Sequence, residues 1–148
     1  MIVRQLSIIL ENRLGAITEV LAVLKENGIN LRASALADTS EFGILRIIVN
    51  DPEKVEQMLL KSNFTVRVTQ VLALALDDDA GSLYENMRKL SDAGVNVMYT
   101  YGFAASPGIG ARVILKVDNL QLAVRILNGQ KVEPYLHDEE DEIPDFYW

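Results

Sequence analysis

The segment "ENRLGAI", residues 11–17, returns 66 residues later as "DDDAGSL", residues 77–83. Each phrase leads into a run with helical spacing. Each run ends in glycine, an aliphatic residue and asparagine, in "NGIN" at residues 27–30 and "DAGVN" at residues 92–96. Self-similarity at a fixed spacing is typical of repeated structural units. The sequence therefore predicts two copies of one small module.

The first copy reads as strand, helix, strand, strand, helix, strand. Its first helix is expected over Leu14–Asn27 because apolar residues recur there at helical spacing, with Asn12 as a plausible N-cap and Gly28 just after the C-cap. Asp51 is expected to cap the second helix, with Pro52 in its first turn. The residues expected on the core side of the first helix are Ile17, Val20, Leu21 and Leu24. The expected strands are Val3–Leu10, Leu31–Ala37, Gly43–Val49 and Phe64–Val68.

The second copy repeats these roles at the same offset. Gly81 matches Gly15, Leu90 matches Leu24 and Asn96 matches Asn30. Asp118 is expected to repeat the cap of the second helix, and Lys131–Leu136 to form the last strand. The predicted domains are residues 1–68, residues 69–136 and an acidic, aromatic tail at 137–148. Almost no linker separates the two copies, so we expect them to be held closely.

Composition excludes several classes of function. The net charge is -7, which argues against a nucleic-acid surface and an anionic membrane surface, because both need clustered Lys and Arg. The chain has no cysteine and one histidine, so no cofactor or metal site is expected. No signal peptide or membrane span is evident, and a cytoplasmic location is expected. No recognisable catalytic motif is present, so we expect no enzyme activity.

The first strand, the "ENRLGAI" loop, the amphipathic helix, "NGIN" and the second strand together resemble an ACT domain. This is a small amino-acid-sensing module of biosynthetic enzymes. The first copy is most similar to the regulatory domain of bacterial phosphoglycerate dehydrogenase, through its loop and the spacing from Asn12 to Asn30. The resemblance implies an α+β fold with two ferredoxin-like βαββαβ modules packed side by side, antiparallel sheets and helices on one face.

The resemblance also implies a ligand site. In this family an amino acid binds where the loop after the first strand of one module meets the second strand of the other. Carried over, Asn12 and Gly15 would face Asn96, and a pseudo-symmetric site would use Asp78, Gly81 and Asn30. The full set of candidate ligand-binding residues is Asn12, Arg13, Leu14, Gly15, Ala16, Ile17, Asn30, Leu31, Asp78, Asp79, Ala80, Gly81, Ser82, Leu83, Asn96, Val97 and Met98.

These residue types suit an amino-acid ligand. A glycine before a helix lets the backbone approach a ligand closely, and the helix N-terminus beside it offers N–H groups to a carboxylate. Asparagine can both donate to a carboxylate and accept from an ammonium group. The acidic "DDD" segment and nearby tyrosines mildly favour a ligand with a cationic, aromatic or imidazole side chain.

Each motif also has a purely structural interpretation. Asn12 could serve only as an N-cap, and Asn30 and Asn96 could simply tolerate a turn conformation. Gly28 and Gly94 are expected to be C-cap glycines, and "SPGIG", residues 106–110, a hairpin turn rather than a phosphate loop. The "DDD" segment could be a solvated helix start. Alternate positions on the expected strand place Tyr99, Tyr101 and Phe103 on one face, which could be ordinary packing or a pocket lining.

The function that these features favour is a non-catalytic amino-acid-binding sensor with its ligand between the two modules. The alternative is a ligand-free structural or regulatory subunit that binds a biosynthetic enzyme. The expected partners are a free amino acid and either a partner enzyme or a second copy of the chain, with no nucleic acid and no membrane.

Overall fold

The computed structural model describes residues 1–77, 79–104 and 111–129. Its elements in chain order are β1 (Ile2–Glu11), α1 (Ala16–Glu26), β2 (Ala33–Asp38), β3 (Phe42–Ile48), α2 (Pro52–Lys61), β4 (Thr65–Leu76), α3 (Ser82–Asp92), β5 (Val97–Ala104), β6 (Ala111–Val117) and α4 (Leu120–Leu127). Three predicted segments lie outside the described residues: the hairpin at 106–110, the strand Lys131–Leu136 and the tail 137–148; so does the candidate site residue Asp78.

The chain forms two compact units. The first unit is Val3–Gln70, and the second contains Met1, Ile2 and the described residues from Val71 onward. The division falls inside β4, which runs from Thr65 to Leu76 without interruption. The first residue of the chain belongs to the second unit, because the Met1 amino group donates to the Ala73 carbonyl oxygen at 3.1 Å and Ala73 N donates to Met1 O at 2.8 Å.

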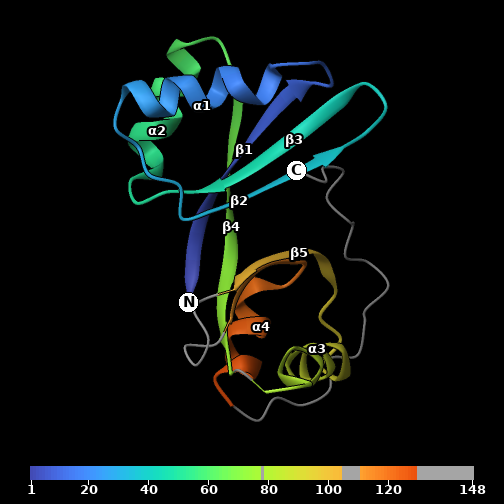
Figure 1. Cartoon of the computed structure of the whole chain (residues 1–148). Helices are drawn as coiled ribbons and strands as arrows, with labels where there is room; N and C mark the ends of the chain where they lie inside the picture. The colour runs from blue at the N-terminus through green and yellow to red at the C-terminus, as the bar shows by residue number, and fades with distance from the viewer. Residues whose placement is uncertain (78, 105–110, 130–148) are drawn as a thin grey trace. The chain divides into compact units, whose positions relative to one another are not determined.

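The first unit is a sheet covered on one face by two helices. Its strand order is β2-β3-β1-β4, and β3 pairs antiparallel with both β1 and β2. Helices α1 and α2 lie together over the sheet (Figure 1). This order of elements and strands is the ferredoxin-like βαββαβ arrangement that the sequence predicts.

Alternation along β1 directs three aliphatic residues to the helices. Leu6, Ile8 and Leu10 are buried in one core with Val20 and Leu24 of α1. Successive strand side chains point to opposite faces, so these β1 residues share the helix side of the sheet. Together they place the "ENRLGAI" loop at the end of a buried strand.

Leu21 departs from the predicted core. Its side chain is 37% exposed, whereas Val20 and Leu24 on the same helix are buried. Four apolar residues at helical spacing span a wide stripe, and the helix contacts the sheet over only part of it. Leu21 therefore lies at the edge of the buried stripe of α1.

The second unit repeats the arrangement in its described part. Its strand order is β4-β6-β5, with both pairs antiparallel, and α3 and α4 pack with these strands around a core of their own (Figure 1). Helix α3 spans Ser82–Asp92, which is α1 displaced by 66 residues at both ends. Leu90 is fully buried there, as its counterpart Leu24 is in the first unit. The repeat predicted from the sequence is thus a structural repeat.

Caps mark the starts of α2 and α4. Asp51 accepts a hydrogen bond from Lys54 N at 3.2 Å, which confirms the predicted cap of α2. The predicted cap at Asp118 is wrong. Asn119 caps α4 by accepting from Leu122 N at 3.0 Å, because the helix begins one residue later than the prediction placed it.

Candidate functional site

A glycine with a left-handed backbone conformation begins each of the helices α1 and α3. Gly15 has φ 84° and Gly81 has φ 92°. A Cβ at either position would meet nothing within 4 Å, so space does not require glycine there. The conformation does, since it is costly for an L-residue with a side chain. The recurrence of these glycines therefore has a local structural cause, which leaves a role in ligand binding open.

The turns before the two helices have the same hydrogen bonds. Ala16 N donates to Arg13 O at 3.3 Å, and Ser82 N donates to Asp79 O at 3.1 Å. Among the described residues, no side chain caps α1 or α3, whereas side chains cap α2 and α4. The suggestion that Asn12 caps the first helix is therefore wrong, because the turn through Gly15 moves the helix start away from Asn12. First-turn N–H groups without a side-chain cap are suited to an anionic group.

Asn12 instead joins its loop by hydrogen bonds to the turn between β2 and β3. Its Nδ2 donates to the Thr39 carbonyl oxygen at 3.3 Å, and its backbone N donates to Glu41 O at 3.0 Å. Both acceptors belong to the turn between β2 and β3, where Thr39 N also donates to Phe42 O at 2.7 Å. The side chain of Asn12 is exposed, so a ligand would reach it from solvent.

Arg13 links the loop to the first turn of α1. Its Nη1 and Nη2 donate to the two Glu19 carboxylate oxygens at 2.9 and 2.8 Å, and its Nε donates to Glu11 at 3.1 Å. The hydrogen bonds to Glu19, then the one to Glu11, raise the pKa of Arg13 above its ordinary value. The same pair lowers the pKa of Glu19. Arg13 is therefore already engaged, with both partners on its own unit.

The corresponding loop of the second unit has a different charge. Asp79 stands where the first unit has Arg13, and Glu85 stands where it has Glu19. Glu85 pairs instead with Arg88 on the next turn of α3 at 2.9 Å, and this hydrogen bond raises the pKa of Arg88. Asp78, the predicted counterpart of Asn12, lies outside the described residues. The two loops thus share a backbone turn and differ in electrostatics.

The remaining loop residues divide between core and solvent. Ala16 is buried in the core of the first unit, and Ile17 packs against that core. Leu14 is 100% exposed, so its side chain faces solvent. In the second loop Asp79, Ala80, Gly81 and Leu83 are exposed, and Ser82 is half-buried.

The second-strand half of the predicted set lies beyond the other end of each helix. Asn30 and Leu31 are exposed in the first unit; in the second, Asn96 is exposed and Val97 and Met98 are half-buried. Asn96 is held by Asp118: Asn96 N donates to Asp118 Oδ1 at 3.0 Å, and Asp118 N donates to Asn96 O at 3.1 Å. This contact gives Asp118 a role that the sequence did not suggest.

One unit alone does not assemble the predicted site. The loop residues precede α1 or α3, and the asparagine follows it, so a helix of 11 residues separates them. At 1.5 Å per residue this is roughly 16 Å, more than the length of an amino acid. Within each unit, the predicted loop residues and the predicted second-strand residues therefore lie at opposite ends of the first helix.

The sequence matches the ACT domain pair family over residues 1–142. The chain belongs to this family. ACT domains are regulatory modules that bind amino acids. The two units are accordingly two ACT modules of ferredoxin-like fold.

Solved structures agree with this assignment. The chain is similar to protein BT0572 from Bacteroides thetaiotaomicron, with 38% identity and a TM-score of 0.82 over 86% of this chain and 88% of that one. It is also similar to the ligand-free regulatory subunit of aspartate kinase from Thermus thermophilus, with 14% identity and a TM-score of 0.59 over 84% and 90% of the two chains. The Thermus flavus counterpart gives 13% identity and 0.57 over the same shares. The two kinase subunits show the fold alone. No curated protein sequence matches the chain.

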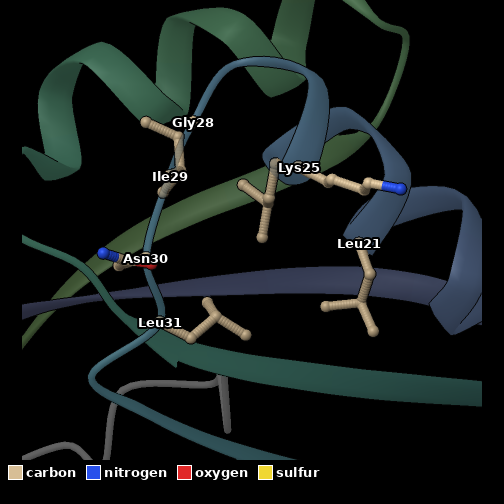
Figure 2. A pocket seen from close by; sticks show the side chains of 7 residues that line it. Leu21, Lys25, Gly28, Ile29, Asn30 and Leu31 are labelled. Carbon is tan, nitrogen blue, oxygen red and sulfur yellow. The ribbon is translucent and has the colours of Figure 1, made fainter.

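A small open pocket lies at the C-terminal end of α1 in the first ACT module. Its lining residues are Leu21, Leu24, Lys25, Gly28, Ile29, Asn30 and Leu31. Figure 2 shows Leu21 and Leu31 on facing sides of the pocket, with the Lys25 ammonium group directed away from Asn30. Of these lining residues, Asn30 and Leu31 belong to the ligand-binding set predicted from the sequence, and Leu21 and Lys25 do not. The helical spacing in the sequence shows that Leu21 belongs to the apolar stripe of α1. Only the folded structure shows that Leu21 lies at the exposed edge of this stripe.

Two tyrosines stack on the second strand of the second ACT module. The rings of Tyr99 and Tyr101 are 6.5 Å apart, centre to centre, at 21°. Both are half-buried and pair with Lys116 and Ile114 of β6. Tyr99 and Tyr101 thus share one face of β5, as expected.

No group of three or more His, Cys, Asp or Glu side chains is placed to hold a metal ion in residues 1–77, 79–104 and 111–129. No helix in this part of the chain is long and apolar enough to cross a membrane.

Proposed function

We propose that this protein is a non-catalytic amino-acid sensor. In the proposed site the loop of one ACT module and the second-strand asparagine of the other hold a free amino acid, and the bound state regulates a partner enzyme in the cytoplasm. The family supports the regulatory and amino-acid-binding parts of this proposal. The residues and their assembly are our inference, as is the closer likeness of the first module to the phosphoglycerate dehydrogenase regulatory domain.

The observation that carries the proposal is the pair of uncapped helix starts. Gly15 and Gly81 turn the backbone into α1 and α3 in the same left-handed conformation, and in the part of the chain that the structure describes no side chain caps either helix. The other two described helices are capped by Asp51 and Asn119. Where capping is otherwise the rule in this chain, its absence leaves first-turn amides available to a ligand carboxylate.

The other end of the ligand needs an acceptor. Asparagine Oδ1 can accept from an ammonium group, and Asn96 and Asn30 are exposed at the predicted places. In the proposed arrangement the loop with Asn12 and Gly15 works with Asn96, and the loop with Asp78 and Gly81 works with Asn30. The pocket with Leu21 and Leu31 would then receive the apolar part of a ligand bound beside Asn30.

A specific observation also favours the ligand-free alternative. In the first loop Asn12 already donates to Thr39, and Arg13 already binds Glu19 and Glu11. A loop with these internal bonds is stable without a ligand. The chain could then act as a regulatory subunit that binds an enzyme, or a second copy of itself, through its surface alone.

A ligand screen separates the two functions. Each common amino acid is added at millimolar concentration, and the melting temperature is followed by scanning calorimetry. A ligand at 100 times its dissociation constant stabilises the folded state by about 2.7 kcal/mol. We expect one chemical class of amino acid to raise the melting temperature, with isothermal titration calorimetry giving its stoichiometry.

Two matched ligands test the role of the helix starts. The carboxamide of the binding amino acid lacks the negative charge, and we expect it to bind much more weakly than the parent. The D-enantiomer tests whether binding is stereospecific. If no amino acid stabilises the protein, the sensor proposal is abandoned in favour of the ligand-free subunit.

A further inference from the structure

The pocket at the C-terminal end of α1 has apolar walls that are open to solvent. Leu21 lies on α1 and Leu31 shortly before β2, and their side chains face each other across the pocket (Figure 2). Leu21 is 37% exposed and Leu31 is 36% exposed. Ile29 also lines the pocket and packs against the core of the module. A ligand side chain in this pocket would therefore contact aliphatic groups.

Backbone groups beside the pocket are already hydrogen-bonded within the module. Gly28 N donates to Lys25 O at 3.1 Å, and Ile29 N donates to Leu24 O at 2.9 Å. These bonds close the last turn of α1 and use polar groups that a ligand side chain would otherwise meet. Burial of a polar group without a hydrogen-bond partner costs free energy. The walls of the pocket are therefore unfavourable for a polar ligand side chain.

Lys25 brings a positive charge to the lining of the pocket. A cationic ligand side chain would lie near this like charge, which is unfavourable. An acidic side chain would gain little, because Lys25 is exposed, its ammonium group is directed away from Asn30, and exposed ion pairs contribute weakly (Figure 2). Charged side chains of either sign are thus poorly served here.

The matching positions of the second module pack inward. At the offset of 66 residues, Met87 matches Leu21 and Val97 matches Leu31. Met87 and Val97 are half-buried and pack against the core of their module, whereas Leu21 and Leu31 are exposed. The open apolar walls are therefore a feature of the first module.

We propose that the pocket beside Asn30 selects an amino acid with an uncharged, aliphatic side chain. This inference rests on the proposed function and assigns a ligand class to it. The pocket has a volume of about 310 Å³, near the lower end of the roughly 300–1,000 Å³ that is typical of small-molecule sites. This size suits a leucine-like side chain rather than a folded partner. The class differs from the cationic, aromatic or imidazole one that the "DDD" segment favours, because leucines and a lysine line this pocket.

Two pairs of ligands test this class on the unaltered protein. Leucine and asparagine have nearly the same shape, and norleucine is lysine without its terminal ammonium group. By isothermal titration calorimetry we expect leucine to bind ~10-fold or more tightly than asparagine, and norleucine to exceed lysine by a similar factor. Equal or tighter binding of asparagine, lysine or glutamate would overturn the aliphatic class and leave the sensor proposal standing. Failure of every amino acid to bind would overturn both.

A pair of variants tests whether the pocket is the source of the selectivity. Leu21→Ala removes one wall and should weaken leucine binding by roughly 10-fold, while asparagine binding changes less. Leu60→Ala makes the same change on α2, at a 43% exposed position outside the pocket, and should leave leucine binding unchanged. Both positions are exposed, so both variants should fold, which circular dichroism verifies. Equal leucine affinity in the two variants would contradict the assignment of the pocket.

Discussion

Arg13 donates two parallel hydrogen bonds to the Glu19 carboxylate, so a loop residue is bonded to the first turn of the helix that follows it. Both side chains are about half exposed, and salt therefore screens the pair. The pair bridges the turn through Gly15 and keeps the acidic partner at the positive end of α1.

This pair should be visible in a pH titration. The pKa of Glu19 is lowered in the folded state, so its contribution to stability is present above the ordinary glutamate pKa of about 4.3 and is lost as the pH falls through the lower folded value. In Arg13→Gln we expect the pKa of Glu19 to rise toward its ordinary value, as measured by carboxyl NMR. Arg88→Gln is the control and should leave the Glu19 titration unchanged.

Replacing Gly15 tests the left-handed turn. Gly15→Ala should lower the free energy of unfolding by roughly 1–2 kcal/mol, because the conformation and not a clash is costly. Gly15→Asn should lose less, since asparagine tolerates this region better. Chemical denaturation measures both. Equal stability of Gly15→Ala and the parent would show that the turn adopts another conformation in solution.

The cap of α4 can be tested directly, because the structure assigns it to Asn119 and the sequence predicts Asp118. Asn119→Ala removes the acceptor for Leu122 N and should cost about 1 kcal/mol of stability. Gln121→Ala lies on an exposed position of the same helix and should change stability by about 0.5 kcal/mol or less. A similar loss in the two variants would argue against a capping role for Asn119.

Leu21 and Leu24 lie three positions apart on α1, yet only Leu24 is fully in the core. Leu24→Ala should cost about 2–5 kcal/mol of stability, as should Leu90→Ala at the matching place in the second module. Leu21→Ala should cost about 1 kcal/mol or less, because that side chain already contacts solvent. Thermal and urea unfolding provide the comparison.

The two loops should respond differently to exchange of their polar residue. Under the proposed function Asn12→Asp weakens the site shared with Asn96, because a carboxylate repels the carboxylate of the ligand. Asp78→Asn changes only the site shared with Asn30. A charge-assisted hydrogen bond contributes on the order of 1.5–3 kcal/mol, so an affinity change of ~10-fold or more is expected by calorimetry. Wild-type affinity and stoichiometry in both variants would remove these loops from the site.

Repetition made much of the fold predictable. The offset that aligns Gly15 with Gly81 also aligns α1 with α3 residue for residue. Strand alternation and helical spacing placed the buried leucines because they depend on local periodicity. The ends of elements were less predictable. Any nearby polar residue can satisfy a capping rule, so the rule indicates Asn12 and Asp118, although the residues that begin α1 and α4 are Gly15 and Asn119.

The candidate site was harder to predict than the fold. The sequence identifies Asn12 and Arg13 as polar loop residues but not their partners Thr39 and Glu19, because these contacts depend on how the hairpin and helix come together. The same holds for Asp118, whose carboxylate receives Asn96 N. Side-chain partners that are distant in sequence need the three-dimensional structure.

The pairing of Met1 with Ala73 has a consequence for the way the chain is made. The two residues are 72 positions apart, and at 5–20 residues per second the ribosome adds the second one roughly 4–14 s after the first. During that interval the start of the chain has no partner strand in the second unit, even if the first unit has already formed. An affinity tag fused ahead of Met1 would lie beside the pairing of Met1 with Ala73. Its effect should therefore be measured as the fraction of newly synthesised chains that reach the folded state.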